Sequence, residues 1–198
     1  EDAGLAARYS RLMAESQVLV AQDTLRLVDL SRRKHLLDVG GGTGAFLAEV
    51  AKVHPCLTLS LFDLPAVLAT VPPGLKDRIT CHPGSFRTDP LPGGADTISL
   101  VRVLYDHPDA VVAALLAAVH ASLPSGGHIV ISEPMSGGAK PDPSTDIYFA
   151  IYTLAMRTGR TRSAAEIAAL LTATGFVQVR SRPGDRPYVT SVVQAVRP

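Results

Sequence analysis

A glycine-rich segment that begins with an acid, Asp38-Val39-Gly40-Gly41-Gly42-Thr43-Gly44, holds the residues with the clearest chemistry in this chain. An apolar run precedes it, and residues 45–53, which follow it, have helical spacing. A glycine turn between a strand and a helix lets bare backbone approach a cofactor closely. A second acid, Asp63, ends the next apolar run, where a carboxylate can bind both hydroxyls of a ribose. Asp63 can equally cap the helix that follows it.

Two classes of cofactor compete for this turn. Dinucleotide-binding oxidoreductases have the pattern Gly-x-Gly-x-x-Gly, whose third glycine would stand at Ala45 or Leu47 here. S-adenosylmethionine (SAM) methyltransferases have the pattern acid-x-Gly-x-Gly-x-Gly, which residues 38–44 match at every fixed position. SAM has no phosphate, and its methionine end carries an ammonium and a sulfonium that suit an acid at the start of the turn. The turn therefore favours SAM, and a nicotinamide dinucleotide is the alternative.

The segments that must position these residues alternate between strand and helix. This alternation predicts an α/β fold with a doubly wound, Rossmann-like, seven-stranded sheet, mostly parallel with an antiparallel C-terminal strand. The strands are expected at residues 35–39, 57–63, 79–84, 96–104, 128–132, 176–180 and 188–196. The helices are expected at residues 3–30 with a break near 15–16, and at 45–53, 64–69, 110–123, 147–156 and 163–175.

The connections between these elements contain the turn-forming residues. Pro72-Pro73-Gly74 is expected to stop the helix at 64–69, and residues 105–109 to form a polar loop after the fourth strand. Residues 136–145 contain Gly-Gly, Lys-Pro and Asp-Pro pairs, which predict a mobile loop. A capping box of Ser163 and Glu166 is expected to open the helix that follows. As domains, we expect residues 1–30 to be leading helices that pack on a catalytic, cofactor-binding domain at 31–198.

The composition excludes several classes of function. The 198 residues are 46% hydrophobic and 19% charged with a net charge of +1, so neither nucleic acid nor an anionic membrane is an expected partner. No apolar stretch approaches the roughly 20 residues that span a bilayer. The six histidines and two cysteines do not cluster at metal-ligand spacing, so no metal is expected, and Cys56 and Cys81 are expected in the core. A reducing, cytoplasmic location fits this cysteine content.

Several further segments resemble one enzyme class, the bacterial and plant small-molecule O-methyltransferases of the caffeic acid, acetylserotonin and hydroxyneurosporene type. The resemblance runs from Tyr9 to the end of the chain. Residues 102–107 and 146–152 are most similar to the carotenoid enzymes, which methylate hydroxyneurosporene or demethylspheroidene. The segments that resemble the class are residues 36–44, Phe62-Asp63-Leu64-Pro65, Gly84-Ser85-Phe86, Arg102-Val103-Leu104-Tyr105-Asp106 and Glu133-Pro134.

The resemblance implies a set of cofactor and substrate contacts. In the class an acid stands where this chain has Ser85, so one contact to the adenine is weakened, whereas the ring of Phe86 suits a purine or simply the core. Arg102 occupies a basic position near the cofactor or pairs with a nearby acid. Tyr9 and Met13 match a pair that lines the substrate pocket, or else they pack between helices. The implied cofactor contacts are Asp38, Gly40, Gly42, Gly44, Asp63, Leu64, Ser85, Phe86 and Arg102.

The chain departs from the class at the general base. Many members have Leu-His-Asp-Trp where this chain has Leu104-Tyr105-Asp106-His107. Tyr105 thus takes the place of the base, although a phenol with a pKa of roughly 10 accepts protons poorly at neutral pH. We rank His107, which can also be a surface loop residue, level with Tyr105, and Asp106 behind them. Glu133 matches an acid that orients the base, and Thr161 falls near the place of a second one.

The predicted function is SAM-dependent O-methylation of an apolar small molecule, a hydroxylated carotenoid first of all. The alternatives are methylation of another small phenol or polyketide, a nicotinamide-dependent oxidoreductase, and a cofactor-binding domain without catalysis. The class implies a two-domain subunit whose N-terminal helical domain forms a homodimer. We expect that this domain is absent here and that the chain is a piece of a longer protein. Whether the enzyme touches a membrane surface is left open.

Overall fold

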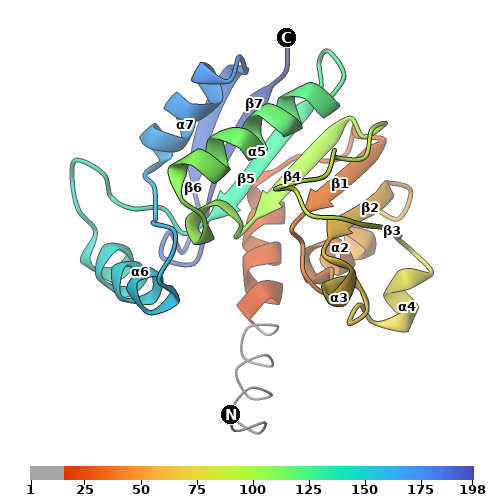
Figure 1. The fold of residues 1–198 in the computed structure, drawn as a ribbon, viewed down its shortest axis with the longest axis horizontal. Coiled ribbons are helices and arrows are strands. Elements are labelled where there is room, and N and C mark those ends of the chain that lie inside the picture. Colours follow the sequence, from red (N-terminus) through yellow and green to blue (C-terminus); the bar gives the residue numbers. More distant parts are fainter. Residues whose placement is uncertain (1–15) are drawn as a thin grey trace, which may run out of the picture.

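The computed structural model describes residues 16–198, so Tyr9 and Met13 lie outside the described residues. A seven-stranded sheet in the order β3-β2-β1-β4-β5-β7-β6 forms its centre (Figure 1). The pairs from β3 to β5 are parallel, and β7 is antiparallel to both of its neighbours. This confirms the predicted fold class. The strands are β1 (His35–Val39), β2 (Thr58–Asp63), β3 (Thr80–Pro83), β4 (Thr97–Val101), β5 (His128–Glu133), β6 (Val177–Pro183) and β7 (Ser191–Val196).

Helices cover both faces of the sheet, because successive strand residues point to opposite faces and both sets are apolar. One hydrophobic cluster packs α5 and α7 against one face, and a second packs helix 16–27, α2 and α3 against the other. In the described part of the chain, no helix is long and apolar enough to cross a membrane. The helices are residues 16–27, α2 (Ala45–Val53), α3 (Pro65–Leu68), α4 (Pro73–Lys76), the 3₁₀ helix η1 (Leu104–Asp106), α5 (Asp109–Ser122), α6 (Pro143–Met156) and α7 (Ala164–Ala173).

The direction of the chain across the sheet reverses between β1 and β4, which are neighbours in space. At such a switch point the connections after the two strands leave the sheet on opposite faces and open a crevice at its carboxyl edge. The glycine turn follows β1 at this edge, and Arg102 follows β4. The turns after β2 and β3 lie beside them, so the fold brings four connections to one place.

The fourth strand is shorter than predicted. It ends at Val101 because Arg102 has a φ of 58°, a left-handed conformation that interrupts extended backbone. Residues 104–106 then form η1 instead of a polar loop, and the side chains of Leu104 and Tyr105 are buried. The prediction was wrong because Tyr105, read as a polar residue, packs its ring among aromatic side chains of α6.

Three smaller predictions also differ from the structure. Pro73 begins the short helix α4 instead of ending a segment, because a proline fits the first helical turn, where no backbone N–H is needed. Helix α6 begins at Pro143, inside the predicted loop 136–145, with the Asp142 carboxylate accepting from the Ser144 amide. Cys56 is exposed in the turn before β2 and Cys81 is half-buried on β3, so neither belongs to the core.

The capping box of α7 is confirmed. The Ser163 hydroxyl accepts a hydrogen bond from the Glu166 amide, and the Ser163 amide donates to the Glu166 carboxylate. Ser163→Ala removes one of these two bonds from a helix that packs on the sheet. We expect the free energy of unfolding, measured with urea, to fall by about 1 kcal/mol. Ser125→Ala, at an exposed turn residue, is the control, and an equal effect of both substitutions would show that the cap is not the cause.

Candidate functional site

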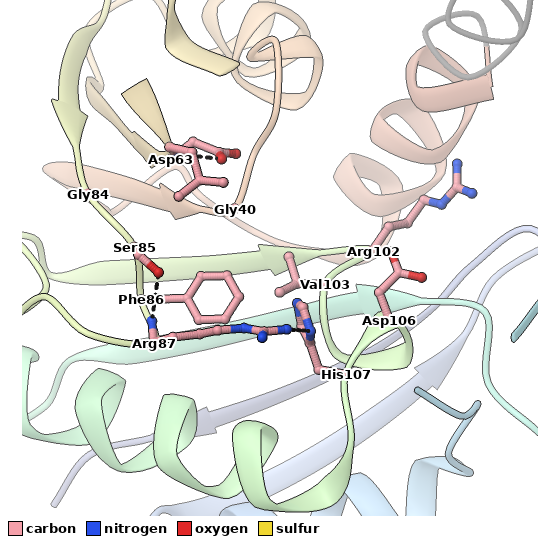
Figure 2. A pocket seen from close by; sticks show the side chains of 11 residues that line it. Gly40, Asp63, Gly84, Ser85, Phe86, Arg87, Arg102, Val103, Asp106 and His107 are labelled. Atoms are coloured by element: carbon pink, nitrogen blue, oxygen red, sulfur yellow. Dashed lines mark hydrogen bonds between the residues drawn. The ribbon is translucent and has the colours of Figure 1, made fainter. Parts of the chain in front are cut away.

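A cavity of about 440 Å³ lies at the carboxyl edge of the sheet, where the four connections meet (Figure 2). Small-molecule sites occupy roughly 300–1,000 Å³, so the cavity is of the right size for a cofactor. Seven residues predicted as site residues line it: Gly40, Asp63, Leu64, Ser85, Phe86, Arg102 and His107. Gly84, Arg87, Val103 and Asp106 complete its lining.

Asp63 ends β2 and reaches back to the glycine turn. Its Oδ2 accepts a hydrogen bond of 2.8 Å from the Gly42 amide, and its Oδ1 accepts one of 2.7 Å from the Leu64 amide. The residue that caps α3 is Leu64, and no side chain caps this helix, so Asp63 is not a helix cap. A carboxylate has about four acceptor positions. Two positions of Asp63 thus remain for donors on a ligand in the cavity.

The glycine turn brings only the backbone of Gly40 to this cavity. A side chain at Gly40 would come within 3.1 Å of Val103 and 3.7 Å of Phe86, and one at Gly41 would collide with the Asp38 carboxylate at 2.1 Å. Gly42 is bound to Asp63, and Gly44 is the N-cap residue of α2. The start of the turn therefore requires glycine, because the side chains of Val103, Phe86 and Asp38 leave no room for a larger residue.

Asp38 does not line the cavity. It is fully buried, its Oδ1 accepts a 2.6 Å hydrogen bond from the Ser99 hydroxyl, and its Oδ2 has no partner in the described chain. Burial raises the pKa of Asp38 to about 7, against the effect of Ser99. Asp38 borders a separate cavity of about 50 Å³, together with Gln17 and Gly42. It therefore lines this small cavity and not the main one.

Phe86, Arg87 and His107 form one wall of the cavity. The rings of Phe86 and His107 meet edge to face with centroids 5.2 Å apart, and Arg87 Nη2 lies 3.0 Å from His107 Nδ1. Burial and the charges of Arg87 and Arg162 lower the pKa of His107. Ser85, next to this wall, donates its amide to Asp89. His107 is thus a half-buried residue of the cavity wall and not a free surface histidine.

Tyr105, predicted as a base, does not line the cavity. Its side chain is only 2% exposed and meets Phe149 and Tyr152 with ring centroids 5.7 Å away in each case. Burial raises the pKa of the phenol above its usual value. Tyr105 therefore packs η1 against α6, with a phenol that is harder to ionise than free tyrosine. The resemblance alone did not reveal the left-handed backbone of Arg102, after which the chain turns into η1.

Glu133, predicted to orient the base, lies beneath η1. Its Oε2 accepts a 2.9 Å hydrogen bond from the Leu104 amide, and its Oε1 has no partner in the described chain. Burial raises the pKa of Glu133 to about 8, against the effects of the Leu104 amide and of Arg162. Glu133 therefore holds the backbone of the loop after β4 rather than the ring of His107.

Arg162 is a supporting residue that the sequence analysis missed. Its guanidinium is completely buried and donates to the carbonyl oxygens of Leu104 and His107 and to the Asp109 carboxylate, at 2.8, 2.9 and 2.6 Å. Gly159 passes so close that a side chain there would lie 2.1 Å from the Tyr105 carbonyl. An arginine and a glycine before a capping box were the available signals, but neither identifies a distant partner. Thr161, which falls near the place of the second orienting acid, is partly buried beside Arg162.

Asp106 and Arg102 form the wall opposite Phe86. The Arg102 guanidinium donates to the Ser16 hydroxyl at 3.0 Å and lies 5.8 Å from the centre of the Tyr105 ring. Figure 2 shows its side chain pointing away from Phe86 and His107. Burial raises the pKa of Asp106 to about 6, against the charge of Arg102 and a hydrogen bond with Tyr152. The Oδ1 of Asp106 is enclosed and has no donor among residues 16–198.

Comparison with known proteins decides the family. Residues 1–177 match the model of the O-methyltransferase domain. The chain belongs to the O-methyltransferase domain family. Demethylspheroidene O-methyltransferase of Rhodobacter capsulatus is 60% identical over 197 residues, which cover 100% of this chain and 50% of that protein. The enzyme of the same name from Cereibacter sphaeroides is 59% identical, with 100% and 53% covered. This O-methyltransferase domain thus spans about half the length of the curated relatives it matches.

Solved structures agree with this assignment. The mitomycin 7-O-methyltransferase MmcR superposes with a TM-score of 0.85 at 26% identity, over 100% of this chain and 59% of that one. Human N-acetylserotonin methyltransferase, solved in complex with SAM, gives a TM-score of 0.83 at 26% identity, over 96% of this chain and 55% of that one. The O-methyltransferase domain therefore has the fold of solved methyltransferases.

The raised pKa of Glu133 makes stability depend on pH. A carboxyl whose pKa is about 8 when folded and roughly 4.3 when unfolded binds more protons in the folded state between these values. Its contribution is therefore complete below pH 4 and lost as the pH rises toward 8, by at most about 1.4 kcal/mol per pH unit. In urea unfolding, Glu133→Gln should flatten this decline. A decline as steep as in the wild type would show that Glu133 is not its source.

Proposed function

We propose that this domain binds SAM in the cavity at the carboxyl edge and that the whole protein transfers its methyl group to a hydroxyl of an apolar small molecule. The observation that carries the proposal is the Asp63 carboxylate, which faces the cavity of an O-methyltransferase-family chain with two acceptor positions left open. When bound, SAM supplies a methyl group on a positively charged sulfur.

The residues that line the cavity have the chemical groups that SAM binding requires. Asp63 would bind the ribose hydroxyls, and the ring of Phe86 would contact the adenine. Gly40 would let the backbone pass close to the methionine end, since a side chain there would press on Val103. Ser85 offers the adenine a hydroxyl in place of the class's acid. Arg102 lines the cavity, and its guanidinium is turned toward Ser16.

For the substrate, we propose a hydroxylated carotenoid such as demethylspheroidene. The two relatives near 60% identity bear that name, whereas an enzyme named for a naphthoate, from Streptomyces sahachiroi, is 33% identical. Pairing of two subunits through a further domain is likewise a proposal from the family resemblance. The substrate and the partner subunit concern the whole protein, because the relatives are about twice as long as this chain.

In the reaction, this chain would act mainly by aligning the substrate hydroxyl with the methyl group of SAM. Glu133 and Arg162 hold the loop 104–109 from below, through its amide and carbonyl groups respectively. The loop in turn fixes Asp106 and His107 at the cavity. Alignment of two reactants can supply several kcal/mol of a barrier, and it suits a donor that is already reactive.

Calorimetry with SAM and with NAD separates this proposal from the oxidoreductase alternative. We expect the domain to bind SAM and its product S-adenosylhomocysteine, and to bind NAD at least 100-fold more weakly. The reason is that the turn matches the SAM pattern at every fixed position, while Ala45 and Leu47 occupy the glycine positions of the dinucleotide pattern. Tight NAD binding without SAM binding would refute the proposal.

The ribose role of Asp63 can be tested by pairing a variant with an altered ligand. Asp63→Ala should weaken S-adenosylhomocysteine binding about 10- to 100-fold, because a hydrogen bond to a charged group contributes roughly 1.5–3 kcal/mol. The same substitution should matter much less for a 2′-deoxy analogue. Asp77→Ala, at an exposed residue of another surface, is the control. Equal losses for both ligands would assign Asp63 to the turn alone.

A further inference from the structure

Four side chains that line the cavity have an atom able to accept a proton: Asp63, Ser85, Asp106 and His107. The reaction needs such an atom, since a hydroxyl that gains a methyl group must lose its proton. Ser85 is a poor acceptor at neutral pH. Asp63 lies at the ribose position, and each of its oxygens already accepts a backbone amide. The choice is therefore between His107 and Asp106, two neighbouring residues of the loop after β4 (Figure 2).

The contact with Arg87 decides the role of His107. A guanidinium has only donors, so the 3.0 Å contact requires His107 Nδ1 to be the acceptor. A neutral imidazole carries one N–H, which must then be on Nε2. Both nitrogens are thus committed, and taking up a further proton would place two cations side by side. His107 is a hydrogen-bond donor at this wall.

Asp106 has the opposite properties. Asp106 lines the cavity, and its carboxyl has a hydrogen bond with Tyr152, while its enclosed Oδ1 lacks a donor in the described chain. A buried acceptor without a donor is costly, and rotation of the carboxyl toward the cavity would let a substrate hydroxyl supply the missing donor. The charged and titratable groups near it are Arg102 from the turn after β4, Tyr105 from η1, Tyr152 from α6 and Glu133 from β5. No ion pair within residues 16–198 includes Asp106.

We propose that Asp106 is the proton acceptor for the substrate hydroxyl, and that Arg87 holds His107 as an Nε2–H donor. This inference rests on the proposed function. The substrate oxygen forms a bond to the methyl carbon while the bond from that carbon to sulfur breaks and its electron pair stays on sulfur. The hydroxyl proton passes to the Asp106 carboxylate, which becomes a neutral carboxyl and later releases the proton to water. One positive and one negative charge disappear together, so the cavity gains no net charge.

Single-turnover methyl transfer to demethylspheroidene in detergent micelles, measured in the complete protein across pH 5–9, tests this assignment. The pKa of Asp106, about 6, predicts that the rate rises with pH to a plateau above pH 7. A general base contributes roughly 100- to 10,000-fold, so Asp106→Asn should lose at least 100-fold and the rise as well. His107→Gln should lose less than tenfold and keep the rise. Asp77→Asn is the control for an unrelated acid.

Three outcomes overturn the assignment. The first is an Asp106→Asn rate within tenfold of the wild type with the rise intact. The second is loss of the rise in His107→Gln. The third is loss of SAM affinity in Asp106→Asn by calorimetry, which would make Asp106 a cofactor residue. A wild type that binds SAM but methylates no hydroxylated substrate would instead refute the proposed function itself, and this inference with it.

A measurement without any ligand tests the same groups in the domain alone. By NMR, the Asp106 carboxyl carbon should titrate near pH 6, and the His107 ring nitrogens should show the Nε2–H form. Arg87→Gln should let the two neutral forms of the His107 ring mix, and it should leave the Asp106 titration in place. An Asp106 midpoint near the ordinary value of about 4, or an Nδ1–H form of His107, contradicts the proposal.

Discussion

The hydrogen bond from the Gly42 amide to the Asp63 carboxylate joins the turns that follow two neighbouring strands, β1 and β2. It holds the glycine turn in backbone conformations with positive φ, 70° at Gly40 and 63° at Gly42. The same carboxylate accepts the Leu64 amide, so the turn, the end of β2 and the entry to α3 are fixed together. Because the two amides occupy only part of the acceptor capacity of the carboxylate, Asp63 also has acceptor positions left for a ligand in the cavity.

The other side of the cavity depends on buried polar groups that lie under the loop 104–109. Glu133 binds the loop through an amide, and Arg162 binds it through two carbonyl oxygens and Asp109. Removing either partner would leave buried groups without hydrogen bonds, which is costly. The left-handed backbone of Arg102 is held in this same region. Rigid support of this kind positions Asp106 and His107 within narrow limits, as alignment of two reactants requires.

Most of the fold could be predicted from the sequence, since its apolar runs, glycines and prolines act locally. The five strands up to β5, the turn after β1 and the capping box at Ser163 all followed from short-range patterns. The residues that set the chemistry of the cavity did not. Tyr105 is buried where the chain turns after the left-handed backbone of a single residue, Arg102, and Arg162 binds partners more than fifty positions away in the chain. The link between Arg87 and His107 likewise joins two loops that only the folded sheet brings together.

A crystal structure of this domain with S-adenosylhomocysteine tests the central claim most directly, because it places the ligand against each wall of the cavity. We expect both ribose hydroxyls within hydrogen-bond distance of Asp63, the adenine against Phe86, and the sulfur on the side of the cavity formed by Asp106. A ligand bound elsewhere, or one bound in the cavity with its ribose turned away from Asp63, would contradict the account.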